Sequence, residues 1–138
     1  MKVSQVDTWV VGVKDKSGEA ATKLDALAKA GINLEFVIAR RSPETPGTGV
    51  VFVTPIKGAA KKAAAKAAGF TTSKSLNTIR VEGKDKKGRG AKITLTLADA
   101  GINLRGFSAA AIGKKFLCHI ALDSADDVAK AMKALKRL

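Results

Sequence analysis

The chain has 138 residues, of which 46% are hydrophobic and only 4% aromatic, and its formal net charge is +13. This composition predicts a folded core of aliphatic side chains, and the positive charge favours anionic partners. The single cysteine, Cys118, excludes an intramolecular disulfide, and no apolar run is long enough for a signal peptide or a membrane span. We therefore expect a cytoplasmic protein with no membrane partner.

An internal repeat organises the chain. Asp15-Lys16-Ser17-Gly18 is followed by a helical pattern and then by Gly31-Ile32-Asn33-Leu34. The same order returns with an offset of 70 residues, as Asp85-Lys86-Lys87-Gly88 and Gly101-Ile102-Asn103-Leu104. A repeat in constant register indicates two copies of one structural unit.

Apolar periodicity gives the elements of the first copy in chain order. β-branched runs predict strands, and residues spaced three or four apart predict helices. Strands are expected over residues 6–14, 32–41 and 49–54, and helices between Ser17 and Gly31 and over residues 57–68. Ser17 is the expected N-cap of the first helix. The expected buried faces are Ala21, Leu24, Leu27 and Ala28 in the first helix and Ala60, Ala63, Ala64 and Ala67 in the second.

The second copy repeats this order. Strands are expected over residues 77–84, 102–111 and 116–122. Ile93 to Leu97 alternates like a strand, but the repeat places a helix there, and we let the repeat decide because local propensity is a weak prior. The last helix is expected to start at Ser124, which has capping-box spacing to Asp127, and to bury Val128, Met132 and Leu135.

Each copy therefore reads β-α-β-β-α, one strand short of the ferredoxin-like plan. Residues 71–75 can complete the first sheet, and residues 1–5, which correspond to them in the repeat, can complete the second. We expect an α+β protein of two βαββαβ units with antiparallel sheets and exchanged edge strands. In sequence, the two domains are residues 1–70 and 71–138.

Both Asp-Lys-x-Gly loops lead into a helix N-terminus, where backbone N–H groups and nearby lysines favour a small anion such as a carboxylate or phosphate. Asn33 and Asn103 open the next strand, at the other end of that helix. One copy cannot bring loop and Asn together, whereas two copies can. The alternative for both Asn residues is a purely structural turn.

The strand, the Asp-Lys-x-Gly loop, the helix and the Gly-Ile-Asn-Leu motif resemble the ACT domain, and the whole chain resembles stand-alone proteins of two such domains. The resemblance implies a regulatory role and an amino acid bound at the interface between domains. Carried onto matching positions, it implies the ligand-binding residues Asp15, Lys16, Gly18, Asn33, Asp85, Lys86, Gly88 and Asn103. The chain departs from the family at Ser17 and Lys87, where the loop usually has proline.

An enzyme is not expected. Cys118 and His119 are neighbours in a predicted strand, so their side chains point to opposite faces and cannot share a metal or form a nucleophile–base pair. No cofactor or metal site is predicted. The alternative function is nucleic-acid binding through phosphate contacts, because the charge is high but the strand over residues 49–54 lacks most of the rings of an RNA-recognition motif.

The sequence thus predicts a non-enzymatic, allosteric regulator that binds a small amino acid or similar carboxylate and passes that state to a partner enzyme or regulator. A homodimer is a further possible assembly.

Overall fold

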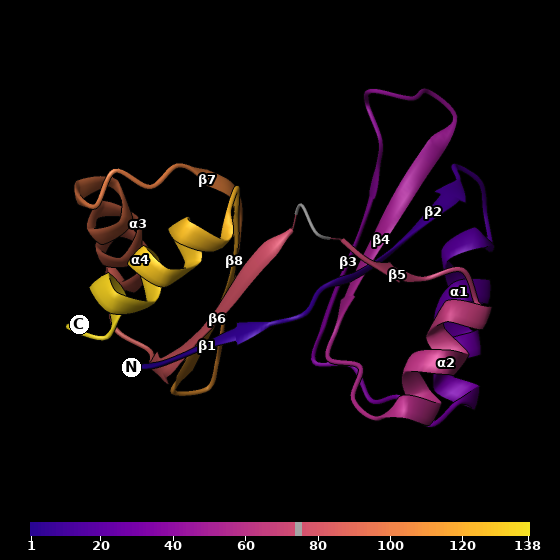
Figure 1. Cartoon of the computed structure of the whole chain (residues 1–138), viewed down its shortest axis with the longest axis horizontal. Helices are drawn as coiled ribbons and strands as arrows, with labels where there is room; N and C mark the ends of the chain where they lie inside the picture. The colour runs from indigo at the N-terminus through magenta and orange to yellow at the C-terminus, as the bar shows by residue number, and fades with distance from the viewer. Residues whose placement is uncertain (74–75) are drawn as a thin grey trace. The chain divides into compact units, whose positions relative to one another are not determined.

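In the computed structural model, which describes residues 1–73 and 76–138, the first copy folds as two helices on a four-stranded antiparallel sheet (Figure 1). The sheet order is β3-β4-β2-β5. Its elements are β2 (Trp9–Lys14), α1 (Glu19–Lys29), β3 (Phe36–Arg41), β4 (Thr48–Thr54), α2 (Ala59–Ala67) and β5 (Thr71–Thr72).

The second copy has the same plan, with sheet order β1-β6-β8-β7. Its elements are β6 (Asn77–Lys84), α3 (Arg89–Asp99), β7 (Leu104–Ile112), β8 (Lys115–Leu122), α4 (Ala125–Leu135) and, from the start of the chain, β1 (Lys2–Val6). Both sheets have the strand order of a ferredoxin-like unit, which confirms the predicted fold class.

The predicted exchange of edge strands is present. β1 pairs antiparallel with β6, from Lys2 opposite Glu82 to Val6 opposite Thr78. β5 pairs with β2 and completes the sheet of the first copy. The prediction for that closing segment extended to residues 74 and 75, which lie outside the described residues.

The compact units consequently follow strand pairing. Asp7–Ser73 forms one, called here the first unit, and Met1–Val6 joins residues 76–138 in the other, the second unit. The division at residue 70 describes the repeat in the sequence.

Each unit has its own aliphatic core between sheet and helices. In the first unit Leu27, Val51, Val53 and Phe70 are almost or fully buried around Trp9. The core of the second unit is larger, and its buried side chains come from β6, β8 and all the helices of that unit: Ile79, Val81, Ile93, Leu97, Phe116, Cys118, Ile120, Leu122, Val128, Ala131 and Leu135.

The predicted helix over Ile93–Leu97 is confirmed within α3. Ile93 and Leu97 are fully buried, while Leu95 is 63% exposed, so burial follows the helical period. The intervening threonines satisfy their hydroxyls locally, since Thr94 donates to the Gly90 carbonyl and Thr96 to the Lys92 carbonyl. Burial of one stripe therefore outweighs β propensity here.

Several local predictions need correction. Gly18, and not Ser17, is the N-cap of α1, and no side chain caps that end. The buried side of α1 runs through Leu24 and Leu27, flanked by Ala20, while the expected Ala21 and Ala28 are exposed. In α2, Ala65 is the buried residue.

The α2 prediction was wrong because the side of the helix opposite the lysines is not the side that packs: the buried Ala65 lies one turn after Lys61 and Lys62, on the same face. Among the alanines expected inside, Ala64 is half-buried, and Ala60, Ala63 and Ala67 are exposed. In α4, by contrast, Ser124 caps the helix by accepting from the Asp127 amide at 3.1 Å, as predicted. Val128 and Leu135 are buried and Met132 packs at the edge of the core.

Among the described residues, no helix has the length and apolar character needed to cross a membrane.

Candidate functional site

The first loop joins β2 to α1 and holds charges in pairs. The Asp15 amide donates to the Gly47 carbonyl at 3.0 Å, which ties the loop to the β3–β4 turn. The Asp15 carboxylate accepts from Arg41 Nε at 2.9 Å, and Lys16 lies 3.8 Å from Glu19. Gly18 has φ +87, a backbone conformation that residues with a Cβ rarely adopt, so glycine is required at the helix start.

The second loop has the same backbone but a different charge pattern. The Asp85 amide donates to the Lys114 carbonyl at 2.9 Å, and Gly88 has φ +77. Arg89, which stands where the first copy has Glu19, donates from Nη2 to the Lys84 carbonyl at 2.9 Å. The repeat therefore preserves the loop geometry while replacing an acid by a base.

A small cavity lies beside each loop, inside each unit. In the first unit it has a volume of about 230 Å³ and lies between the loop, β3 and β4. In the second it has a volume of about 340 Å³ and lies between the loop, β7 and Phe116 of β8. Ligand cavities usually have about 300 to 1,000 Å³, so the second lies at the lower end of this range and the first just below it, and both limit a ligand to a small molecule.

The two cavities have a similar charge. Lys14, Lys16, Arg40 and Arg41 line the first together with one acid, Asp15. Asp85 is likewise the one acidic residue lining the second, beside three basic residues: Lys86, Lys87 and Arg89. Both cavities can therefore offer a cation to the carboxylate of a zwitterion and an acid to its ammonium, and both favour an anion overall.

Of the predicted site residues, Asp15 and Lys16 line the first cavity, and Asp85, Lys86 and Gly88 line the second. Gly18 shapes its loop through the positive φ described above. The arginines Arg40 and Arg41 were missed by the sequence analysis. The available signal was two adjacent cations at the end of an apolar strand. β2 and β3 both pair antiparallel with β4, so they end at the same edge of the sheet, and the end of β3 lies near the loop that follows β2.

Within a unit, the structure does not bring Asn33 or Asn103 to these cavities. α1 and α3 each have 11 residues, or about 16 Å of helix, and the Asn follows the far end. In Gly-Ile-Asn, Gly31 has φ +76 and the Ile32 amide donates to the Leu27 carbonyl at 3.1 Å, which ends α1. Ile32 is buried and Asn33 exposed, so the motif has a structural part and a solvent-facing polar part.

Cys118 and His119 do not form a site together. Cys118 is fully buried in the core of the second unit, and burial raises the pKa of its thiol to about 12. Its strand neighbour His119 is also buried, with the side chain on the opposite face of β8. Within residues 1–73 and 76–138, no group of His, Cys, Asp and Glu has an arrangement that could hold a metal ion.

No protein-family model matches the chain, and no curated protein matches it in sequence. Solved structures do resemble it. Protein BT0572 from Bacteroides thetaiotaomicron has a TM-score of 0.79 and 17% identity, with 97% of this chain and 90% of that chain covered.

Two regulatory subunits of aspartate kinase are also similar over nearly the whole chain. That of Thermus thermophilus, in its ligand-free form, has a TM-score of 0.63 at 17% identity and covers 99% of this chain and 96% of its own. That of Thermus flavus has a TM-score of 0.57 at 18% identity and covers 99% and 94%. At sequence identities below 20%, this similarity shows a shared fold. The predicted resemblance to proteins of two ACT domains is thus confirmed at the level of the fold.

Proposed function

We propose that the chain is a non-enzymatic regulatory protein that binds a small amino acid, or a similar carboxylate, at the loop before the first helix of each copy of its repeat. The observation that carries this proposal is the pair of loop cavities, which occupy equivalent places in the two units and have volumes of about 230 and 340 Å³. The ligand residues are Asp15, Lys16, Gly18 and Asn33 with Asp85, Lys86, Gly88 and Asn103.

The chemistry of the loops supports a carboxylate ligand. Lys16 and Lys86 are exposed at the start of a helix, where the helix dipole also favours negative charge. Asp15 and Asp85 can accept from a ligand ammonium, and a side-chain amide such as Asn33 or Asn103 can both donate and accept. Together these groups match the two charged ends of an amino acid.

Similarity to regulatory subunits of aspartate kinase supports a regulatory role with a partner enzyme. Regulation requires that the ligand bind two arrangements of the protein with different affinity. The partner is then the protein that binds one of those arrangements preferentially.

Calorimetric titration with each of the amino acids tests this function. A ligand should bind with measurable heat, and Lys16→Ala or Lys86→Ala should weaken it about tenfold or more, as expected for loss of a charge-assisted hydrogen bond. The matched control is Lys61→Ala, because Lys61 is an exposed lysine of α2 and lines neither cavity.

The double variant of Lys16→Ala with Lys86→Ala tests the use of both copies. If each loop binds a ligand, each single variant should weaken one binding event and the double variant both. A single variant that abolishes all binding would contradict the use of both copies. Absence of heat with every amino acid would overturn the proposed ligand class.

A further inference from the structure

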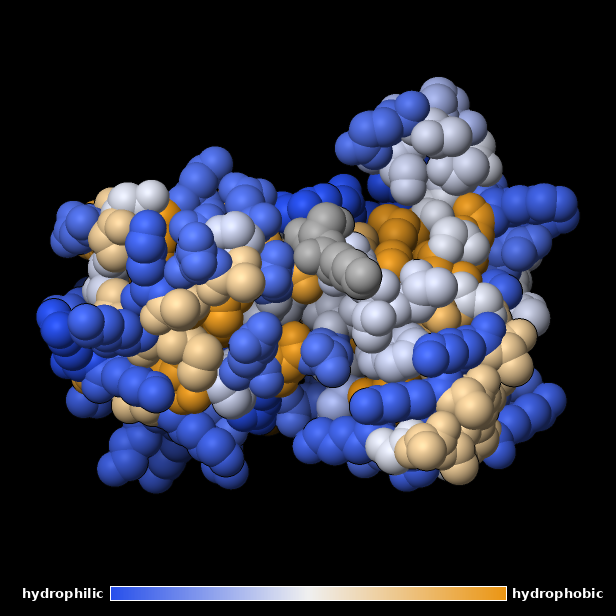
Figure 2. Space-filling model, viewed as in Figure 1, coloured by the Kyte–Doolittle hydropathy of each residue, from blue (hydrophilic) through white to orange (hydrophobic). Residues whose placement is uncertain are grey.

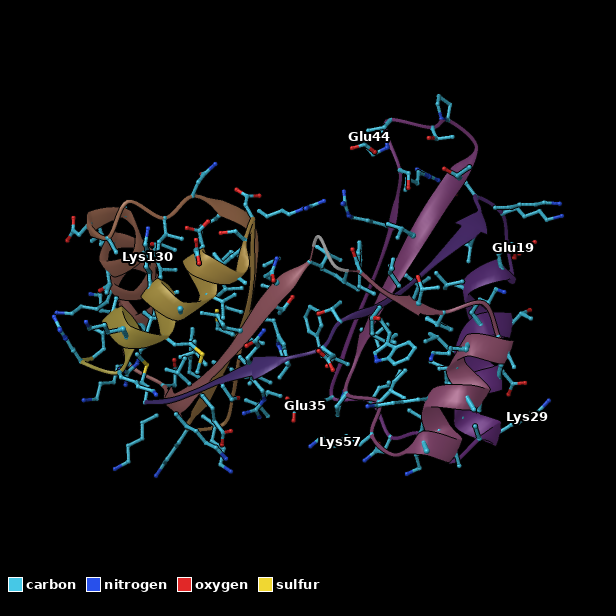
Figure 3. All side chains as sticks on the ribbon, in the orientation of Figure 1. Glu19, Lys29, Glu35, Glu44, Lys57 and Lys130 are labelled. Atoms are coloured by element: carbon cyan, nitrogen blue, oxygen red, sulfur yellow. The ribbon has the colours of Figure 1, made fainter. Side chains whose placement is uncertain are left out.

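One end of the second unit carries an excess of positive charge that the first unit lacks. Seven basic residues from the loop after β6, the first turn of α3 and the β7–β8 turn make up this basic surface: Lys84, Lys86, Lys87, Arg89, Lys92, Lys114 and Lys115. All but Arg89 are classed as exposed, and Arg89 is half-buried. In Figure 3, nitrogen-tipped side chains project outward below this end of the unit.

Strand pairing and hydrogen bonds bring four of these residues together. Lys84 lies directly opposite Lys115 on the neighbouring strand. Lys114 accepts from the Asp85 amide at 2.9 Å, and Arg89 donates to the Lys84 carbonyl at the same distance. Like charges directly opposite each other in a sheet are unfavourable, so an anion bound here would relieve a repulsion built into the fold.

The acidic residues near this surface do not neutralise it. Asp85 is one, and Glu82 borders it. Arg80 forms an ion pair with Glu82. The hydrogen bond and the charge of Arg80 lower the pKa of the Glu82 carboxyl, and the charge of Lys115 lowers it further. Glu82 is therefore already engaged by a residue outside the basic surface.

The first unit is an internal control for this charge. At equivalent repeat or register positions it has Ser17 for Lys87, Glu19 for Arg89 and Thr48 for Lys115. Two of its basic residues there are ion-paired, Arg41 with Asp15 and Lys16 with Glu19, while Lys14 and Arg40 add positive charge beside the same loop. Because the same backbone supports both patterns, the fold does not require the basic surface.

We propose that the basic surface of the second unit is a docking site for the phosphodiester backbone of a nucleic acid. Seven cations are enough for the phosphate contacts that give non-specific affinity, about 10⁻⁴ to 10⁻⁶ M at physiological salt. Such contacts carry little sequence information, so the binding is sequence-tolerant.

An anionic membrane fits the surface less well. Peripheral binding to a bilayer uses buried apolar area in addition to charge. Ile112, which adjoins the β7–β8 turn, is 76% exposed. One isoleucine supplies at most about 1.5 to 3 kcal/mol on burial. Hydrophilic residues otherwise dominate the lower edge of this unit in Figure 2.

Fluorescence anisotropy of the full chain with a labelled duplex DNA and a labelled single-stranded RNA tests the proposal over a range of salt. If all seven cations contact phosphates on the duplex, the slope of log K against log salt approaches about −6, and it is less steep on a single strand. The two probes separate the possible sources of the same phosphodiester chemistry.

The decisive variant combines Lys87→Ser, Arg89→Glu and Lys115→Thr. Each substitution introduces the residue that the first copy has at the equivalent position, and together they remove four units of positive charge. Its matched control is Lys57, Lys61, Lys62 and Lys66 each changed to Gln, which removes the same charge from exposed positions at and before α2. Thermal unfolding of both variants checks that they fold.

The first variant should lose at least about 30-fold in affinity at 0.1 M salt and reduce the slope by about 2 to 3, because three phosphate contacts disappear. The control should lose less than about threefold. Equal losses in both variants would overturn the proposal in favour of general charge. The proposal would also be overturned if the native chain shows no salt-dependent binding to either nucleic acid. It would be overturned in favour of a membrane if the first variant loses affinity for phosphatidylserine vesicles but keeps its affinity for both nucleic acids.

Discussion

Deletion of Met1–Val6 should destabilise the second unit and leave the first unit, which follows directly in the chain, nearly unchanged. β1 contributes five residue pairs to β6, and Met1 and Val3 pack against the core of the second unit. The pairs are worth roughly 1 kcal/mol each, and half-burial of the two side chains adds roughly 2 to 3 kcal/mol in all. Ordering the six residues costs roughly 1 kcal/mol per residue, which leaves a net loss of about 1 to 2 kcal/mol.

Hydrogen exchange resolved by residue is the assay, because it reports stability separately for each element. Amides of β6 and β8 should exchange faster by about 5- to 30-fold, which is the stated free energy converted at 1.4 kcal/mol per factor of ten. Amides of β2 should keep their protection. Loss of protection in β2 with β6 unaffected would show that the N-terminal strand belongs to the unit that follows it, and would refute the exchange of edge strands.

Three further predictions concern single residues. Ser124→Ala should lower the free energy of unfolding by about 1 kcal/mol in denaturant titration, because it removes an N-cap acceptor. Ser17→Ala should change it by less than about 0.5 kcal/mol, because Ser17 does not cap α1. Equal losses in the two variants would contradict the capping assignment. Gly18→Ala should lower the free energy of unfolding by about 1 to 2 kcal/mol because Gly18 has φ +87, although no atom lies within 4 Å of the added Cβ. In the control Gly12→Ala, at an exposed strand position, stability should be unchanged or slightly higher. Unchanged stability in Gly18→Ala would refute the backbone requirement. Burial raises the pKa of Cys118 from 9.0 to about 12, so the folded state holds the thiol proton more tightly than the unfolded chain, and this contribution to stability is complete below pH 9 and is lost as the pH rises toward 12. The free energy of unfolding should accordingly fall less between pH 9 and pH 12 in Cys118→Ala than in the native chain. Rapid alkylation of Cys118 in the folded protein would contradict its burial.

The fold was largely predictable because the repeat supplied information that local propensity could not. Ile93 to Leu97 alternates like a strand and was assigned correctly only because it lies where the other copy has its first helix. The exchange of β1 followed from counting strands, since each copy was one strand short. Long-range pairing was therefore inferred from symmetry, not from residue preference.

Local detail was harder to predict. Ser17 has a good capping side chain, but the left-handed Gly18 starts α1 one residue later. The strand predicted from residue 32 begins only at Phe36, because Gly-Ile-Asn closes the helix before the chain can enter the sheet. These outcomes depend on backbone angles, which a hydrophobic pattern does not specify.

The candidate site was predictable in part. The loops carrying Asp15 and Asp85 line cavities, but Arg40 and Arg41 contribute to the first cavity through the fold of β3 beside the loop, which is not visible in the linear motif. The motif around Asn33 combines a helix end with an exposed amide, so its sequence pattern reports structure as well as function.

The most direct test of the central claim, that the chain senses a small amino acid, is a thermal-shift screen against all the common amino acids. A ligand present at 100 times its dissociation constant stabilises the folded state by about 2.7 kcal/mol, which corresponds to a rise in Tm of several degrees. We predict such a rise with at least one amino acid, and its reduction in the Lys16→Ala and Lys86→Ala variants. A screen up to about 10 mM detects a ligand with a dissociation constant of about 0.1 mM or lower. If no amino acid changes the Tm at these concentrations, the claim is contradicted.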